Sequence, residues 1–197
     1  MPLIPIQRNE GSGDYKTLNE TKVSCTQSVQ SMSIYTNTTE GRHLMKQVLI
    51  TTLHLITPAE TLVVPAEITY DGSEEIGGKT KLTLVYEKKE YVAFGNDGLN
   101  PYLLADLTAK LPGGVVPACC MTCQHGNMCP YCSNDNELFC TKDLSITSKE
   151  DICNLFDSTD PYKERSVAPL DFCDKYAPQD SGYYTYNDYY SFLSKQQ

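Results

Sequence analysis

The distribution of cysteine along the chain constrains the fold more than any other feature. Nine of the 197 residues are cysteine; Cys25 stands alone, and the other eight lie between Cys119 and Cys173. A short segment with few aliphatic side chains rarely builds a sufficient apolar core, and it commonly relies on disulfides or a bound metal instead. The cysteines therefore separate a part of the chain that needs no cross-link from a part that does.

Within the cluster, the spacing of the thiols predicts a structural metal site. Two cysteines separated by two residues can reach one ion from a single tight turn, which is typical of structural zinc. The chain has two such pairs, and a single cysteine follows the second pair after seven intervening residues. The predicted ligands are four of Cys120, Cys123, Cys129, Cys132 and Cys140, with His125 as a substitute.

Two other interpretations of the cluster remain open. Eight cysteines form an even number, and loops rich in Tyr, Asn and Asp are typical of disulfide frameworks, which would need no cofactor. An iron–sulfur cluster is also bound by four thiolates. The spacing thus predicts a cross-linked module and leaves the nature of the cross-link open.

The sequence Cys129-Pro-Tyr-Cys132 resembles the active-site motif of glutaredoxins. The resemblance implies thiol–disulfide exchange by these two cysteines, in a motif that opens a helix of a thioredoxin-like unit. No helical periodicity follows Cys132 in this chain, so we expect a metal knuckle or a disulfide turn here. A thiol redox enzyme is kept as an alternative function.

The part before the cluster alternates with the period of a β-strand. Residues 48–56 are β-branched and apolar on both faces, which predicts a central strand. Residues 62–70 alternate cleanly as in a half-buried strand, and Pro65 places that strand near an edge or a bulge. Residues 82–86 and 91–94 flank a predicted turn at 87–90, and a further short strand is expected near 29–35. These patterns predict a small, mainly antiparallel β domain.

A short helix is expected to close this domain. Asn100 is a good N-cap, Pro101 suits the first helical position, and leucines form one apolar stripe up to Leu111. Pro112 and the two glycines after it end the helix and mark the domain boundary. The predicted organisation is α+β, with a flexible arm at 1–22, a β domain at 23–114 and a small Cys-rich, acidic, metal- or disulfide-stapled module with short helices at 115–197.

Three short helices are expected in the module. They begin at a capping box over 147–150, at Asp160-Pro161 and at 185–188. The last one follows a tyrosine-rich stretch, and tyrosine is enriched at protein interfaces. The candidate interface residues are Tyr183, Tyr184 and Tyr190, of which the first two lie off the apolar stripe of that helix.

The net charge and the sequence motifs limit the classes of function that this chain can have. The net charge of -9 argues against direct binding of nucleic acid, which needs clustered Lys and Arg. No apolar stretch is long enough for membrane insertion and no signal peptide is seen, so we expect a cytoplasmic protein or one within a virion or other assembly, with a secreted form still open.

Familiar catalytic motifs are missing. We therefore predict a non-enzymatic protein–protein interaction or assembly protein, such as a structural subunit of a particle or filament, which binds another protein or copies of itself. The alternatives, besides the redox enzyme, are an acidic inhibitor that mimics nucleic acid and a secreted disulfide-rich binding protein.

Overall fold

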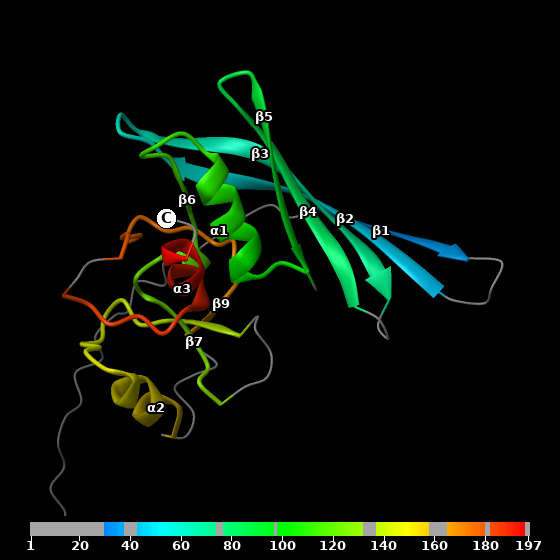
Figure 1. The fold of residues 1–197 in the computed structure, drawn as a ribbon. Helices are drawn as coiled ribbons and strands as arrows, with labels where there is room; N and C mark the ends of the chain where they lie inside the picture. The colour runs from blue at the N-terminus through cyan, green and yellow to red at the C-terminus, as the bar shows by residue number, and fades with distance from the viewer. Residues whose placement is uncertain are drawn as a thin grey trace, which may run out of the picture.

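The chain folds into an N-terminal curled antiparallel sheet followed by a smaller region with short helices, a small sheet and several cysteines (Figure 1). This computed structural model describes residues 30–37, 43–73, 77–96, 98–131, 137–157, 165–179 and 182–195. The predicted α+β class is confirmed at this level. The predicted arm, Cys25 and the helix expected at Asp160-Pro161 lie outside the described residues.

Six strands of the described chain form the N-terminal sheet: the first five lie side by side in the order in which they occur along the chain, and the sixth pairs with the second. Strand β2 pairs with β1 through its first half, and its last three residues pair with the short strand β6. The prediction of a central strand at 48–56 is therefore confirmed. The strands are β1 (Gln30–Asn37), β2 (His43–Ile56), β3 (Thr61–Ser73), β4 (Gly77–Tyr86), β5 (Lys89–Asn96) and β6 (Val116–Ala118).

Pro65 lies inside β3 at a position where the strand tolerates proline. It is the register partner of Thr52 on β2, whereas the ladder between β3 and β4 begins one residue later, at Ala66. A proline has no backbone N–H to donate, so it disrupts a strand least where one neighbour has already ended. The predicted position of Pro65 near an edge is thus found in one sense: Pro65 lies just beyond the end of the β3–β4 ladder.

The hairpin between β4 and β5 turns more tightly than the sequence predicts. The turn consists of Glu87 and Lys88, both in the left-handed region with φ of 49° and 65°. Such two-residue turns favour Asn-Gly or Asp-Gly, because most side chains are strained at positive φ. A turn made of Glu and Lys therefore gives no local sequence signal, and the predicted loop at 87–90 was two residues too long.

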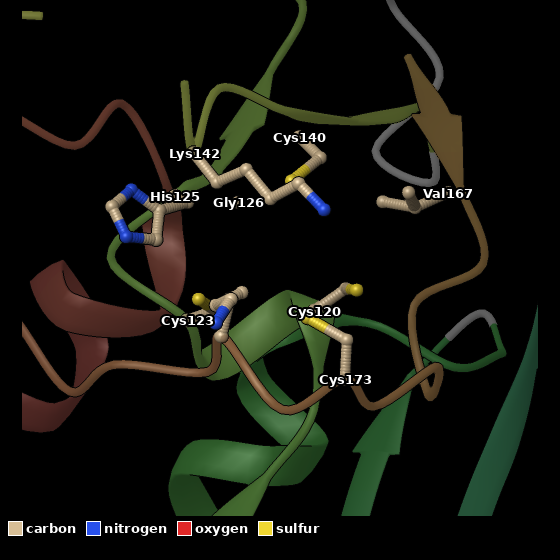
Figure 2. Close-up of a pocket in the computed structure, with 9 residues that line it drawn as sticks. Cys120, Cys123, His125, Gly126, Cys140, Lys142, Val167 and Cys173 are labelled. Carbon is tan, nitrogen blue, oxygen red and sulfur yellow. The ribbon is translucent and has the colours of Figure 1, made fainter. Parts of the chain in front are cut away.

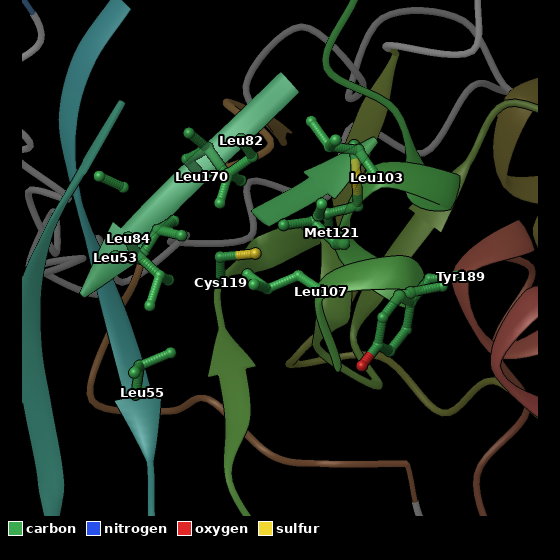
Figure 3. Packing of buried hydrophobic residues seen from close by; sticks show 14 of the residues in the cluster. Leu53, Leu55, Leu82, Leu84, Leu103, Leu107, Cys119, Met121, Leu170 and Tyr189 are labelled. Atoms are coloured by element: carbon green, nitrogen blue, oxygen red, sulfur yellow. The ribbon is translucent and has the colours of Figure 1, made fainter. Parts of the chain in front are cut away.

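Helix α1 (Pro101–Lys110) covers the inner face of the sheet and confirms the predicted helix. The Asn100 side chain caps it by accepting a hydrogen bond from the Leu103 backbone N–H at 3.1 Å. The apolar cluster beneath it continues into the Cys-rich region, as Figure 3 shows. Its members include Leu53, Leu55, Leu82, Leu84, Leu103, Leu107, Cys119, Met121, Leu170 and Tyr189.

The Cys-rich region contains a second small sheet and two short helices. Its elements are the 3₁₀-helix η1 (Cys120–Thr122), the strands β7 (Gly126–Met128), β8 (Leu138–Cys140) and β9 (Ser166–Val167), and the helices α2 (Lys149–Asp157) and α3 (Asp188–Ser194). Strand β8 lies between β7 and β9. No helix in the described part of the chain is long and apolar enough to cross a membrane.

The starts of both helices differ from the predicted ones. The capping box of α2 is formed by Ser148 and Asp151: the Asp151 carboxylate accepts from the Ser148 backbone N–H at 2.9 Å, and the Ser148 hydroxyl accepts from the Asp151 backbone N–H at 3.3 Å. Helix α3 begins at Asp188 with Asn187 as its N-cap. For α3, the Asn187 amide also donates to the carbonyls of Met121 and Gly126, so tertiary contacts support this cap.

Candidate functional site

Four cysteines from separate segments of the Cys-rich region line one small pocket (Figure 2). Cys120 and Cys123 come from η1 and the residue that follows it, Cys140 ends β8, and Cys173 lies in the loop after β9. The rest of the lining is His125, Gly126, Lys142, Val167 and Lys175. The pocket therefore combines thiols, one imidazole and two ammonium groups.

The turn that carries the first two thiols is held from within by Thr122. Its hydroxyl donates to the Pro117 carbonyl at 2.7 Å and accepts from the Cys119 backbone N–H at 3.1 Å. Gly126, at the start of β7, lies so close to this turn that a Cβ there would be 1.9 Å from the Cys120 carbonyl oxygen. Only glycine allows β7 to approach the turn this closely, and β7 in turn pairs with the strand that carries Cys140.

The structure brings some of the predicted ligands together and leaves others apart. Cys120, Cys123, Cys140 and His125 all line the pocket. Cys129 is described but does not line it, and Cys132 lies outside the described residues. Cys173 joins the group although it belongs to no CxxC pair and follows Cys140 by 33 residues, so no spacing rule selected it.

The four thiols of the pocket form no disulfide in the described part of the chain. Among the described residues, no three His, Cys, Asp or Glu side chains lie close enough together to hold a metal ion. The pocket thus collects the donors without forming a coordination sphere. The prediction of a zinc-type metal site is not tested by this arrangement.

Burial raises the pKa of Cys120, Cys123 and Cys140. Desolvation is the main cause for each, and repulsion from neighbouring thiolates adds to it. Desolvation also raises the pKa of Cys119, which points into the apolar core, to about 11. These four side chains therefore favour the neutral thiol.

His125 borders the pocket with its imidazole turned away from Cys120, Cys140 and Cys173 (Figure 2). Its Nδ1 is buried and has no hydrogen-bond partner among the described residues, and its ring meets Tyr183 edge-on at 4.9 Å between centroids. Desolvation, followed by the charge of Lys142, lowers the pKa of the imidazole. His125 is therefore a neutral neighbour of the thiols in this arrangement.

The predicted interface tyrosines are largely engaged within the chain. The Tyr183 hydroxyl donates to the Thr141 carbonyl at 3.0 Å, and the Tyr190 hydroxyl donates to the Thr122 carbonyl at 2.6 Å. Tyr184 is half-buried, and its backbone N–H donates to the Ile146 carbonyl at 3.3 Å. These contacts give the tyrosines a packing role, and their role in an interface stays a prediction.

The segment that resembles the glutaredoxin motif lies in a turn after β7. Cys129 lies outside any helix or strand, Pro130 and Tyr131 form a turn, and Tyr131 is 62% exposed. Residues 132–136, where a following helix would begin, lie outside the described residues. A redox role of the cysteine pair stays an alternative prediction, because Cys132 is not among the described residues.

His54 of β2 is partly buried and lies where the sheet meets the Cys-rich region. Its ring stacks on Phe172 with 4.0 Å between the centroids, which places it firmly against the Cys-rich region. Its Nδ1, however, is buried without a hydrogen-bond partner in the described part of the chain. Desolvation lowers the pKa of the imidazole, so the ring is held as a neutral, largely apolar group.

A second candidate for function is the outer face of the N-terminal sheet, the face opposite the buried leucines. Two contacts within the chain cover parts of it: the Lys110 ammonium of α1 lies 5.3 Å from the centroid of the Phe94 ring, and His54 stacks on Phe172. Four large apolar side chains on it are about half exposed or more: Ile50 (47%), Val63 (59%), Val85 (55%) and Phe94 (60%). The register places Ile50, Glu67, Thr83 and Val92 in one row across the strands, next to the row of Val48, Thr69, Lys81 and Phe94. We refer to the side chains with this orientation on β2 to β5 as the outer face.

Charges on the outer face balance. Lys46, Lys79 and Lys81 oppose Glu67, Asp71 and Glu90, and the register pairs Asp71 with both Lys46 and Lys79. Three positive and three negative groups give this face no net charge, although the whole chain carries -9. Across the strands, several of these charged groups are register partners of the exposed apolar side chains.

Comparison of the chain with models of known protein families, with curated proteins and with solved structures gave no match. The proposals below therefore start from the geometry of the thiol pocket and of the outer face.

Proposed function

We propose that this protein is a non-enzymatic assembly protein in which two copies pair through the outer face of the sheet. The observation that carries the proposal is the exposed apolar side chains on that face, above all Val63, Val85 and Phe94. Burying such area against a second sheet would release water from it, and sheets commonly pack face to face in this way.

The charge distribution favours a second copy as the occupant. Two chains with a charge of -9 repel each other over most of their surface, and a neutral face is where they can approach. In a two-fold arrangement the same patch serves both partners, so the lysines of one copy are available to the carboxylates of the other. Lys81 and Glu67, on neighbouring rows of the face, are such a pair of opposite charges.

A strand of a second copy could instead pair with the edge strand β5, but this edge is less suitable for association. The Phe94 backbone N–H donates to the Asp106 carboxylate at 2.8 Å, and the Val92 carbonyl accepts from the Lys110 ammonium at 3.0 Å. These two side chains of α1 also form a salt bridge at 2.6 Å. Because α1 occupies the outward hydrogen-bonding groups of β5, a strand of another chain finds them engaged.

The Cys-rich region supports this role as a rigid module. Its backbone packs against α1 through α3 and shares the apolar cluster with the sheet. A structural metal of the zinc type, as the cysteine spacing predicts, would hold the module together while the outer face remains available. The function of the module in this proposal is support for the fold, with no chemical step.

Sedimentation and light scattering over a range of concentrations test the proposal. We expect a dimer for the native chain and a monomer for Val85→Lys, which places a charge in the middle of the proposed contact. Tyr131→Lys is the matched control, since Tyr131 is equally exposed but lies outside the sheet. A native chain that stays monomeric at all concentrations, or a dimer that survives Val85→Lys, would contradict pairing through this face.

A further inference from the structure

Backbone hydrogen bonds hold the loop that carries Cys173 against the turn that carries Cys120 and Cys123. On one side of Cys173, the Cys120 backbone N–H donates to the Asp171 carbonyl at 2.6 Å. On the other side, the Gln124 backbone N–H donates to the Ala177 carbonyl at 2.9 Å. Cys173 is thus fixed between two anchor points that both belong to the turn.

Cys140 is held beside the same turn in a similar way. Its own backbone N–H donates to the Arg165 carbonyl at 2.9 Å, and the N–H of Thr141 donates to the His125 carbonyl at 2.9 Å. The ladder of β7 and β8 adds the register pair of Gly126 with Cys140. Three chain segments that are far apart in sequence therefore place their thiols around one space, and each is fixed by its main chain.

The cations that line the pocket suit a ligand set of four thiolates. A divalent ion bound by four thiolates carries a net charge of minus two, and burying this charge requires compensation. Lys142 and Lys175 both line the pocket. Figure 2 shows the Lys142 side chain extending across the pocket toward Cys140 and Val167. Two ammonium groups at this place would balance the charge of the bound complex.

We propose that Cys120, Cys123, Cys140 and Cys173 bind one zinc-type divalent ion. The sulfur atoms reach it by rotation about the Cα–Cβ bonds, since a change of χ1 moves a thiol while its backbone stays in place. The four thiol protons are released to solvent as the ion binds. The ion connects η1, β8 and the loop after β9, and so cross-links a region that has few aliphatic residues.

This ligand set departs from the one that the spacing predicts. Cys173 replaces the pair Cys129 and Cys132, and the turn at 129–131 is left outside the site. His125 is left out of the set because four thiolates already complete a tetrahedral site. In addition, its imidazole is turned away from Cys120, Cys140 and Cys173 in Figure 2. The inference does not depend on pairing through the outer face, so the failure of one proposal leaves the other untouched.

Alkylation of the full native chain tests the ligand set without a substitution. The protein is purified with zinc in the medium, treated with iodoacetamide with or without prior chelation, and mapped by mass spectrometry. We expect the four pocket thiols to be protected until the chelator removes the metal. Cys129 and Cys153, both half-exposed, should react in either case, whereas the core thiol Cys119 should stay protected in both.

Several outcomes overturn the proposal. If chelation exposes Cys129 and Cys132 to alkylation and leaves the labelling of Cys173 unchanged, the ligand set predicted from the cysteine spacing is favoured. Pocket thiols that react only after reduction would show disulfides. Identical labelling with and without chelator, in a folded chain, would show that no metal is held.

Metal content of single variants gives an independent measurement. We expect about one zinc ion per native chain by elemental analysis, and at least a tenfold loss of zinc affinity in Cys173→Ser. Cys129→Ser and Cys153→Ser are the matched controls and should keep the native content. Full zinc binding by a folded Cys173→Ser, or loss of zinc in Cys129→Ser, contradicts the assignment. Stoichiometric iron in place of zinc also contradicts it.

Discussion

The sheet and the Cys-rich region differ in how their backbones are supported. In the sheet, long ladders satisfy the main chain and alternate residues such as Leu53 and Leu55 supply a buried apolar face. In the Cys-rich region the strands are two or three residues long. There, individual polar side chains provide many of the hydrogen bonds that the main chain needs. Asn127, for example, is fully buried; it donates to the Thr141 hydroxyl at 2.8 Å and accepts from the Tyr186 backbone N–H at 2.6 Å.

The difference shows how a region with few aliphatic residues can still become compact. A buried polar side chain contributes only where each of its donors and acceptors finds a partner, because an unpaired buried group costs free energy. Stability of this kind depends on single residues, whereas a ladder distributes it over many. We therefore expect the Cys-rich region to be more sensitive to the loss of one polar side chain than the sheet region is.

The largest effect is expected for Asn187, the N-cap of α3 in the Cys-rich region. The Asn187 amide donates to the carbonyls of Met121 and Gly126 at 2.8 and 2.9 Å, and its oxygen accepts from the Tyr189 N–H at 3.0 Å. Asn187→Ala should lower the free energy of unfolding by about 3 kcal/mol, at about 1 kcal/mol for the cap and for each buried carbonyl.

Asn100→Ala, at the N-cap of α1, is the matched substitution in the sheet region. Asn100 caps Leu103 and donates to the Asn96 carbonyl in a partly exposed setting. We expect a loss of about 1 kcal/mol here. Urea unfolding followed by circular dichroism measures both variants. Equal losses would show that buried side-chain bonds do not distinguish the two regions.

An intermediate effect is expected in the sheet, where one strand offers adjacent valines on opposite faces. Val64 is 9% exposed and Val63 is 59% exposed. Val64→Ala should lower the free energy of unfolding by about 2 kcal/mol, from lost apolar burial and the remaining cavity. Val63→Ala should change it by less than about 0.5 kcal/mol in the monomer. Comparable losses in thermal or urea unfolding would contradict the assignment of the inner and outer faces.

The smallest effect concerns an ion pair of the Cys-rich region. The two terminal guanidinium nitrogens of Arg165 donate to the two carboxylate oxygens of Asp143 at 2.6 and 3.1 Å. Hydrogen bonding to Arg165 lowers the pKa of the Asp143 carboxyl. Because the folded-state pKa lies below the unfolded one, the pair stabilises the fold at neutral pH, and this contribution is lost as the pH falls through the folded-state pKa.

Asp143→Asn should therefore make acid unfolding less steep. The side chain of Asp143 is 59% exposed, so solvent screening keeps the loss at neutral pH below about 1 kcal/mol. The free energy of unfolding at neutral and at acidic pH measures the effect. A difference between the variant and the native chain that grows toward low pH would contradict the sign of the shift.

The regular elements of the sheet region were predictable because their signals are local. The alternation at 62–70 reappears in the buried Val64, Ala66 and Ile68 of β3, and Asn100 with Pro101 marks the start of α1. Both patterns depend on neighbours within a few residues, since the period of a strand and the cap of a helix are properties of the local backbone.

Other features escaped prediction for physical reasons. The turn at Glu87 and Lys88 lacks the residues that usually adopt positive φ, so the pairing of β4 with β5 imposes its conformation. The start of α3 at Asn187 is decided by two carbonyls more than 60 residues away in sequence. The outer face could be derived from the alternation, but its exposure depends on what covers the sheet.

The sequence by itself determined that this chain has an alternating β part and a Cys-rich part with few aliphatic residues, because composition and periodicity express what each segment can bury. Only the tertiary structure decided which thiols meet. CxxC spacing brings two sulfurs together within one turn, and so Cys120 and Cys123 were predicted together. Cys140 was also among the predicted ligands, whereas Cys173 was not. Cys140 and Cys173 join them through backbone hydrogen bonds between distant segments, and such contacts leave no fixed spacing in the chain.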